Sequence, residues 1–212
     1  MRVYCDQCSR FVDAVTQNAH SVTASCTHKI RVRPVPFSEA RRGLELCLHS
    51  AEQLVTSSRI LLGQSDNRTA FFLVLSAYEE MAKCRRILDA AAENASTHGA
   101  LLLEEALFRY HPTKYRLTMD YLDQWIAAND AIRELFSPAV ALGDNADLQA
   151  DRAAIKAGGF EIRNSCLYVD YSSAWIDKAT IDRAKVERNL RMIESMMGGY
   201  RSSLAQWDLA IS

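Results

Sequence analysis

The chain has 212 residues, of which 49% are hydrophobic and 24% are charged, a composition typical of a soluble globular protein with one sizeable domain and a small appendage. These values exclude a disordered or fibrous chain. The formal net charge of −1 gives no general attraction to nucleic acid or to an anionic membrane, so a polyanion must be bound by a local cluster of arginine and lysine side chains.

The hydrophobic pattern indicates neither secretion nor membrane insertion. The N-terminal segment MRVYCDQCSRF lacks the apolar core of a signal peptide. The longest apolar run, from Ala70 to Leu75, is far too short to span a bilayer. Cys47, Cys84 and Cys166 occur singly in apolar segments, as reduced and buried thiols do. We therefore expect a cytoplasmic protein with no membrane partner.

The first 35 residues combine short alternating segments with a set of metal-ligating side chains. The alternating segments SVTASC and KIRVR predict short strands. A C-x2-C-x17-C-x-H pattern supplies four ligands from two knuckles, the usual arrangement of a closed tetrahedral zinc site. Its members are Cys5, Cys8, Cys26 and His28, with His20 as a competing fourth ligand.

A structural zinc ion fits this segment better than redox chemistry does. A redox C-x-x-C normally opens a helix after a strand in a βαβ unit, and no such unit follows here. Too few apolar residues lie in the segment to stabilise a fold without a metal ion or another cross-link. We predict a small zinc-ribbon-like module over residues 1–35, a linker marked by Pro34 and Pro36, and a second domain over residues 36–212.

Helical patterning begins at Ser38 and continues to the end of the chain. Ser38 is the expected N-cap of a helix of about six turns, which ends at Gly63 and the polar segment after it. A second helix is predicted from Asn67 to about Asn94, followed by a short helix over residues 101–110. The inner face of the first helix is predicted to consist of Leu44, Leu48, Ala51, Val55 and Leu62.

The second half of the chain continues the helical pattern. A helix begins at Pro112, because proline is favoured in the first turn, and another runs from about Asp147 to Ala157. The stretch FEIRNSCLYVDYSS that follows is either a kinked helix or an extended passage. Thr180 caps the last helix. About five helices, with no strand signal after residue 36, predict an all-α bundle. The predicted inner positions are Tyr115, Met119, Leu122, Ile126 and Phe136 in the helix from Pro112, and Val186, Leu190, Ile193 and Met197 in the last helix.

The helix that begins at Asn67 carries a charge close to its apolar stripe. At about 100° per residue, Glu79 falls behind the stripe and within i,i+4 reach of Lys83, whereas Glu80 shares a heptad row with Leu73 and Ile87. We therefore expect Glu79 to be exposed and Glu80 to be buried against a cation from elsewhere in the chain. The alternative is that Glu80 reaches solvent or makes a structural hydrogen bond.

The segment HPTK places two polar side chains at the start of a predicted helix. His111 and Lys114 are three residues apart and project from a helix N-terminus, whose unpaired N–H groups favour an anion. The alternative is a surface cap. The basic side chains that would complete such an anion site are Arg85, Arg86, Arg109 and Arg116.

The segment RNSCLYVDY contains a second polar group. The guanidinium of Arg163 is a planar fork that suits phosphate, and Asn164 and Tyr168 supply neutral donors. Asp170 follows two residues later. The alternative is a buried aromatic segment in which these polar residues cap a loop.

The set AxxLxLSAYEEMAK, HPTK and RNSCLYVDYSSAW, in this order, resembles the AbiV-type abortive infection proteins over approximately residues 40–195. These belong to the HEPN superfamily of small all-α proteins, many of which are metal-independent ribonucleases of bacterial defence and toxin–antitoxin systems. The resemblance implies a HEPN-like helical bundle, and residues 1–35 lie outside it. The site residues that it implies are Glu80, Lys83, His111, Lys114, Arg163, Asn164, Tyr168 and Asp170.

The resemblance implies a phage-defence protein that acts on RNA, either as a metal-independent endoribonuclease or as a toxin that blocks translation. Arg163 and Lys114 would stabilise phosphorane charge, His111 would be the base or the acid, and Glu80 would orient one of them. A homodimer is the expected form, and a phage protein is a candidate trigger.

The nuclease members are recognised by R-x4-6-H, and here Tyr168 stands in the place of the histidine. This departure favours the alternative, a non-catalytic binder of a phage or ribosomal component. Arg42 and His49 fit R-x6-H, but they lie in the first predicted helix and not in a late one, so we interpret that match as chance.

Overall fold

The computed structural model describes most of the chain, with gaps between its elements. The described residues are 2–5, 10–13, 15–17, 20–23, 26–93, 100–104, 111–128, 142–167, 170–171, 175–176 and 180–211.

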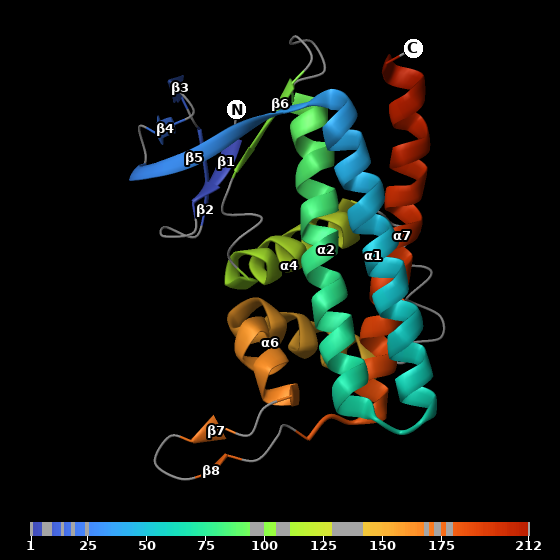
Figure 1. Ribbon diagram of the computed structural model, residues 1–212. Coiled ribbons are helices and arrows are strands. Elements are labelled where there is room, and N and C mark those ends of the chain that lie inside the picture. Colours follow the sequence, from blue (N-terminus) through green and yellow to red (C-terminus); the bar gives the residue numbers. More distant parts are fainter. Residues whose placement is uncertain are drawn as a thin grey trace.

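Five helices occur in the described part of the chain, and α2 lies at their centre. Helices α1, α2 and α7 run side by side along the molecule, with α2 antiparallel to α1, while α4 and α6 pack against α2 from one side (Figure 1). The helical bundle predicted from the sequence is therefore confirmed. The bounds are Phe37–Gly63 for α1, Asn67–Glu93 for α2, His111–Ala128 for α4, Leu142–Leu167 for α6 and Arg183–Ile211 for α7.

The core follows the predicted faces of α1 and α7. Every predicted inner residue of these two helices is buried, as are Tyr115, Met119 and Leu122 of α4. The side chains of Ile126 and Phe136 lie outside the described residues. Helices α1 and α7 each have one side toward their neighbours, so the apolar stripe identifies the buried face correctly in both.

The predicted helix ends are partly correct. Helix α1 ends at Gly63, where Ser65 takes a positive φ of 63° and Asp66 accepts a hydrogen bond from the amide of Thr69 (3.1 Å). The predicted cap at Ser38 is wrong, because α1 begins at Phe37 directly after a strand and has no side-chain cap. The predicted cap at Thr180 is also wrong, since Asp182 accepts from the amide of Lys185 (2.7 Å) at the start of α7.

Helix α6 resolves the ambiguity of the segment after Gly158. The helix runs through to Leu167 with a kink at Gly158, whose φ and ψ of −148° and 34° are not helical. The segment that carries Arg163 and Asn164 is therefore a kinked helix, and both side chains project from regular turns.

A strand takes the place of the first part of the short helix that the sequence predicts over residues 101–110, and residues 105–110 lie outside the described residues. Strand β6 (Ala100–Glu104) pairs antiparallel with β5 (Cys26–Pro36), with Val32 opposite Glu104 and Pro36 opposite Ala100. A short apolar run does not distinguish a buried helix from a strand, which explains this error. The predicted linker is also wrong, since Pro34 and Pro36 both lie in β5. The division of the chain into two domains stays a prediction.

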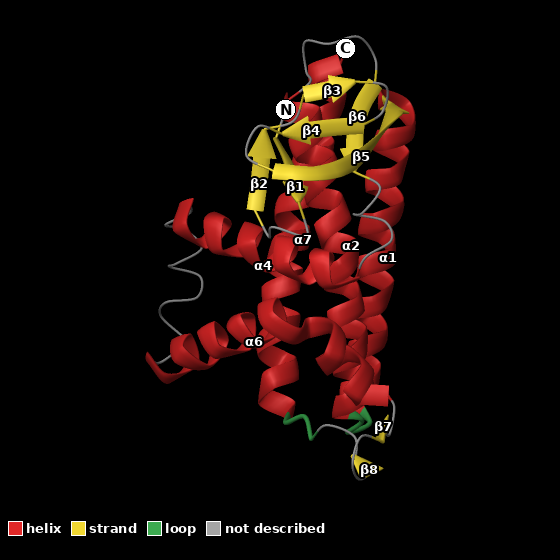
Figure 2. Cartoon of the chain, turned by 90° about the vertical axis from the view of Figure 1, so that its left-hand side faces the viewer, coloured by secondary structure: helices red, strands yellow, loops and turns green. Residues whose placement is uncertain are grey.

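The remaining strands are short. Strands β1 (Arg2–Cys5) and β2 (Arg10–Asp13) form one pair, and β3 (Val15–Gln17), β4 (His20–Thr23), β5 and β6 form a four-stranded sheet. These strands lie at one end of the bundle, and the pair β7 (Asp170–Tyr171) and β8 (Trp175–Ile176) lies at the other (Figure 2). The prediction of short strands within residues 1–35 is confirmed.

A buried ion pair joins β6 to the bundle. Nε of Arg86 on α2 lies 3.0 Å from both carboxylate oxygens of Glu104, and both side chains are buried. Burial opposes the charged guanidinium, but the carboxylate of Glu104 keeps the pKa of Arg86 above its ordinary value. Among the described helices, none is long and apolar enough to cross a bilayer.

Candidate functional site

The carboxylate that contacts basic side chains from other helices is that of Glu79, and not that of Glu80. Glu79 is 5% exposed and lies on the face of α2 that also carries Leu75, Ala82 and Arg86. This face is buried because α4 and α6 cover it, so α2 has more than one apolar side. The prediction that Glu79 is exposed is therefore wrong, since it assumed a single buried stripe.

Glu80 makes a local contact instead. Its carboxylate lies 2.6 Å from Nζ of Lys83, one turn further along α2, and both side chains are roughly one-fifth exposed. The prediction that Glu80 is buried against a cation from elsewhere in the chain is wrong. Lys83 pairs with Glu80 and not, as predicted, with Glu79.

Four side chains from two other helices surround the carboxylate of Glu79. Oε2 lies 2.5 Å from Nδ1 of His111 and 3.6 Å from Nζ of Lys114. Oε1 accepts a hydrogen bond from the hydroxyl of Tyr115 (2.6 Å) and lies 3.7 Å from Nε of Arg163. We call these five residues the Glu79 cluster. The structure thus brings His111 and Lys114 of the segment HPTK together with Arg163, which the sequence places on a separate segment.

The start of α4 explains why three of these side chains converge. His111, Lys114 and Tyr115 are spaced i, i+3 and i+4, so they project from the same side of the first two turns. Tyr115 was not identified as a site residue from the sequence, where it was only a predicted inner residue of its helix. A buried tyrosine hydroxyl needs a partner, and this is the signal that would have found it.

The cluster has a buried layer and an exposed layer. The side chains of Glu79, Lys114 and Tyr115 are buried, whereas those of His111 and Arg163 are 40% and 22% exposed. The ionised carboxylate of Glu79 can only accept a hydrogen bond, so Nδ1 of His111 donates in this contact. In the neutral imidazole, the lone pair is then on Nε2.

Aromatic rings support both exposed side chains. The imidazole of His111 stacks on Phe160, with ring centroids 5.6 Å apart and planes 18° apart. The guanidinium of Arg163 lies 4.6 Å from the centroid of Phe72, and its Nε donates to the hydroxyl of Ser76 (3.3 Å). These contacts restrict the two groups that face solvent.

The buried layer shifts two pKa values. Burial lowers the pKa of Lys114, although the carboxylate of Glu79 opposes this shift. Burial and the same carboxylate raise the pKa of Tyr115, which therefore remains a protonated donor. With Lys114 charged, one carboxylate faces the two cations Lys114 and Arg163 and a histidine, and this excess of positive charge favours an anionic ligand.

Other predicted site residues do not join the cluster or lie outside the described residues. Asn164 is half-buried on α6, and no hydrogen bond joins it to Glu79 in the described structure. Arg86 binds Glu104, and Arg85 binds Asp89 at 2.8 Å. Tyr168, Arg109 and the side chain of Asp170 lie outside the described residues.

The predicted zinc site also lies outside the described side chains. Cys8 is not described, and Cys5, Cys26, His28 and the reserve ligand His20 are described only as parts of strands. Within the described part of the chain, no group of three or more histidine, cysteine, aspartate or glutamate residues is placed to hold a metal ion. The zinc site stays a prediction.

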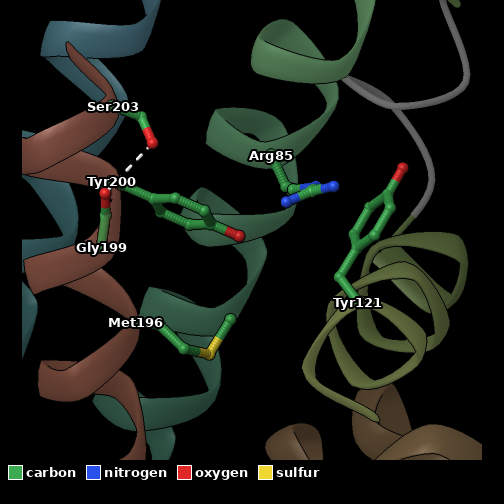
Figure 3. Close-up of a pocket in the computed structure, with 6 residues that line it drawn as sticks. All are labelled: Arg85, Tyr121, Met196, Gly199, Tyr200 and Ser203. Carbon is green, nitrogen blue, oxygen red and sulfur yellow. Dashed lines mark hydrogen bonds between the residues drawn. The ribbon is translucent and has the colours of Figure 1, made fainter. Parts of the chain in front are cut away.

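A small cavity lies between α2, α4 and α7 (Figure 3). Its volume is about 80 Å³, and Arg85 points toward the ring of Tyr121, 5.0 Å from its centroid, with Tyr200 and Ser203 on the α7 side. Pockets for small ligands usually have volumes of about 300–1,000 Å³. This cavity is too small to take a nucleotide, and none of the described residues that line it belongs to the Glu79 cluster.

The comparison with protein families identifies one match. The model of the family described as HEPN_AbiV: AbiV matches residues 39–193, which include every member of the Glu79 cluster. No curated protein and no solved structure matches the chain.

Proposed function

Because this chain belongs to the AbiV family of HEPN proteins, which implies a role in abortive infection as a defence against phage, we propose that it acts on RNA as a metal-independent endoribonuclease. The observation that carries the proposal is the contact between the buried carboxylate of Glu79 and the exposed imidazole of His111. A buried carboxylate that orients a histidine is a common arrangement for a general base.

The proposed reaction is attack by a ribose 2′-hydroxyl on the adjacent phosphorus. Nε2 of His111 takes the proton of the 2′-hydroxyl, and the 5′-oxygen takes a proton from a water molecule as it leaves, which gives a 2′,3′-cyclic phosphate and a 5′-hydroxyl. His111 then returns its proton to the solvent. Arg163 stabilises the charge that develops on the phosphoryl oxygens, and Lys114 adds to the positive potential from the buried layer of the cluster. General base catalysis of this kind contributes about 10²–10⁴-fold to a rate.

The second candidate is a binder without catalytic activity. It is favoured by the contacts within the buried layer. Glu79 contacts both Lys114 and Tyr115, and the three residues join α2 to α4, as the residues of a structural network do. In this role the cluster holds a surface that grips RNA or a ribosomal or phage component, and translation is blocked without cleavage. The two candidates share the buried layer and differ in what His111 does.

The test is cleavage of total RNA by the purified protein in a buffer without added divalent metal ions and without a chelator, so that the proposed structural zinc is not removed. We expect the wild type to cleave and His111→Ala and Arg163→Ala to lose at least about a hundredfold in rate. His49→Ala is the matched control, because His49 is exposed on α1 and far in sequence from the cluster. RNA that is bound but not cleaved by the wild type would replace the ribonuclease by the binder, and equal cleavage by His111→Ala would remove His111 from the mechanism.

Four further features belong to the proposal. The protein works in the cytoplasm as a homodimer, a form that places two clusters near one RNA. A phage protein triggers it. A structural zinc ion held by Cys5, Cys8, Cys26 and His28, or by His20 in place of His28, folds the N-terminal module.

A further inference from the structure

A cavity of about 350 Å³ lies at the bend of α6. Its volume falls within the range of about 300–1,000 Å³ that pockets for small ligands occupy. Two cations, one carboxylate and one aromatic ring take part in its lining. The lining residues are Arg116, Lys156, Ala157, Gly158, Gly159, Phe160 and Glu161.

Two glycines create this cavity and attach it to the Glu79 cluster. The non-helical backbone at Gly158 bends α6. Gly159 packs so closely on Tyr115 that a Cβ atom there would lie 2.6 Å from Cγ of the tyrosine ring. The next residue, Phe160, both lines the cavity and stacks on His111. A ligand in the cavity therefore lies against Phe160, the ring that stacks on the imidazole of His111.

The polar groups of the lining include both an acceptor and donors. Glu161 is exposed, and no hydrogen bond or ion pair joins it to another described residue. Arg116 is half-buried on α4, and Lys156 pairs with Asp120 across the cavity's edge. Asp120 offsets the charge of Lys156, and Glu161 offsets that of Arg116, so the cavity suits a neutral, hydrogen-bonding ring better than a phosphate.

Among the four RNA bases, guanine matches this lining best. Its Watson–Crick edge presents two adjacent donors, N1–H and the N2 amino group, which one carboxylate accepts together. The neighbouring O6 accepts from arginine or lysine. Adenine and cytosine place a ring acceptor beside their single amino group, which a carboxylate repels, and uracil has one N–H between two carbonyls. Unpaired RNA bases are commonly read in this way, with stacking on an aromatic side chain.

We propose that the cavity at the bend of α6 binds an unpaired guanine base next to the phosphate that His111 and Arg163 contact. Glu161 accepts from N1–H and the N2 amino group, Arg116 or Lys156 donates to O6, and Phe160 supports the ring. The inference rests on the proposed action on RNA, and it makes the protein selective for guanine in single-stranded RNA.

The test uses single-stranded uridine oligonucleotides that carry guanosine, inosine, adenosine, cytidine or uridine at one central position. Cleavage rates are measured with the wild type, and affinities are measured by fluorescence anisotropy with His111→Ala, which leaves the RNA intact. We expect a preference of about tenfold or more for guanosine, the usual effect of one bidentate contact with a base. Inosine lacks the N2 amino group, so it should lose most of this preference.

The variant Glu161→Gln tests whether Glu161 causes the preference for guanosine. It should reduce the preference for guanosine over inosine to nearly one, since an amide accepts at one oxygen only. Glu39→Gln is the matched control, because Glu39 is an exposed glutamate in the first turn of α1. Glu161 is exposed, so Glu161→Gln should keep the thermal midpoint of the wild type, and the inosine comparison does not depend on any variant at Glu161.

The outcomes separate this inference from the proposed ribonuclease. Cleavage without base preference overturns the guanine pocket and leaves the ribonuclease. The same conclusion follows if inosine is preferred as strongly as guanosine and Glu161→Gln does not reduce the preference. Guanosine-selective binding by a wild type that cleaves none of the oligonucleotides keeps the pocket and overturns the ribonuclease. Neither binding nor cleavage of any oligonucleotide overturns both.

Discussion

Replacing Glu79 by alanine should destabilise the protein far more than replacing its neighbour Glu80. Glu79 is the acceptor for the buried hydroxyl of Tyr115 and the counter-ion of Lys114, whose side chain is 4% exposed. Removing one partner of a buried ion pair costs about 3–5 kcal/mol, because the other charge is left without compensation. The pair of Glu80 with Lys83 is partly exposed and lies within one helix, and such pairs contribute about 0.3–0.5 kcal/mol.

Thermal denaturation followed by circular dichroism measures this difference. For a chain of this length, 1 kcal/mol corresponds to about 2–4 °C in the melting midpoint. We therefore expect Glu79→Ala to lower the midpoint by about 6–20 °C, and Glu80→Ala to lower it by less than about 2 °C. The two positions are adjacent on one helix, so each variant serves as the control for the other.

A double substitution tests whether the cost comes from the stranded lysine. Combining Glu79→Ala with Lys114→Met leaves no buried cation in the Glu79 cluster, so the double variant should recover part of the stability that Glu79→Ala loses. Additive losses would show that Lys114 and Glu79 are not coupled. Equal midpoints for Glu79→Ala and Glu80→Ala would refute the assignment of the buried carboxylate itself.

Three further predictions concern packing, pH and metal. Gly159→Ala should destabilise the protein by about 1–3 kcal/mol, because its Cβ atom meets the ring of Tyr115. Gly198→Ala, in an exposed turn of α7 with nothing within 4 Å, should stabilise it by about 0.4–1 kcal/mol, and urea denaturation of both variants compares them. The raised pKa of Tyr115 means that the folded protein keeps a proton which the unfolded chain releases near pH 10. The free energy of unfolding should therefore fall as the pH rises above about 10. Tyr115→Phe should reduce the slope of unfolding free energy against pH in that range by up to about 1.4 kcal/mol per pH unit, and a slope equal to that of the wild type would contradict the prediction. Elemental analysis of protein purified with a reductant should find one zinc per chain, and Cys5→Ser should remove it; substoichiometric zinc in the wild type would disprove the N-terminal metal site.

The sequence predicted the helical bundle where each helix has a single buried side. Leu44, Leu48 and Val55 lie on the inner face of α1 as expected, since one stripe faces the neighbouring helices. Helix α2 is different, because helices lie on several sides of it and its charged residues Glu79 and Arg86 are buried as well. The choice between Glu79 and Glu80 depends on where α4 packs, and this information is not present in the pattern of α2 alone.

The convergence of the site was predicted from motifs and not from periodicity. His111 and Lys114 share a helix start, and this placement follows from Pro112. That Arg163 reaches the same carboxylate depends on α6 continuing past its kink, which the ambiguous segment after Gly158 did not reveal. Strand β6 was missed because ALLLE is too short for its periodicity to distinguish the two kinds of structure.

The layering of the Glu79 cluster determines which substitutions can establish its function. Glu79 fixes α4 against α2, and the same carboxylate holds His111 and Arg163 on regular helices, where their positions do not depend on loops. A variant at Glu79, Lys114 or Tyr115 therefore loses stability and activity together, whether the protein is a ribonuclease or a binder. The exposed atoms of His111 and Arg163 contribute less to the fold, so loss of cleavage in a variant with an unchanged melting midpoint is specific to chemistry. His111→Ala is the more decisive of the two, because a binder needs the charge of Arg163 but has no need for the proton transfer at Nε2.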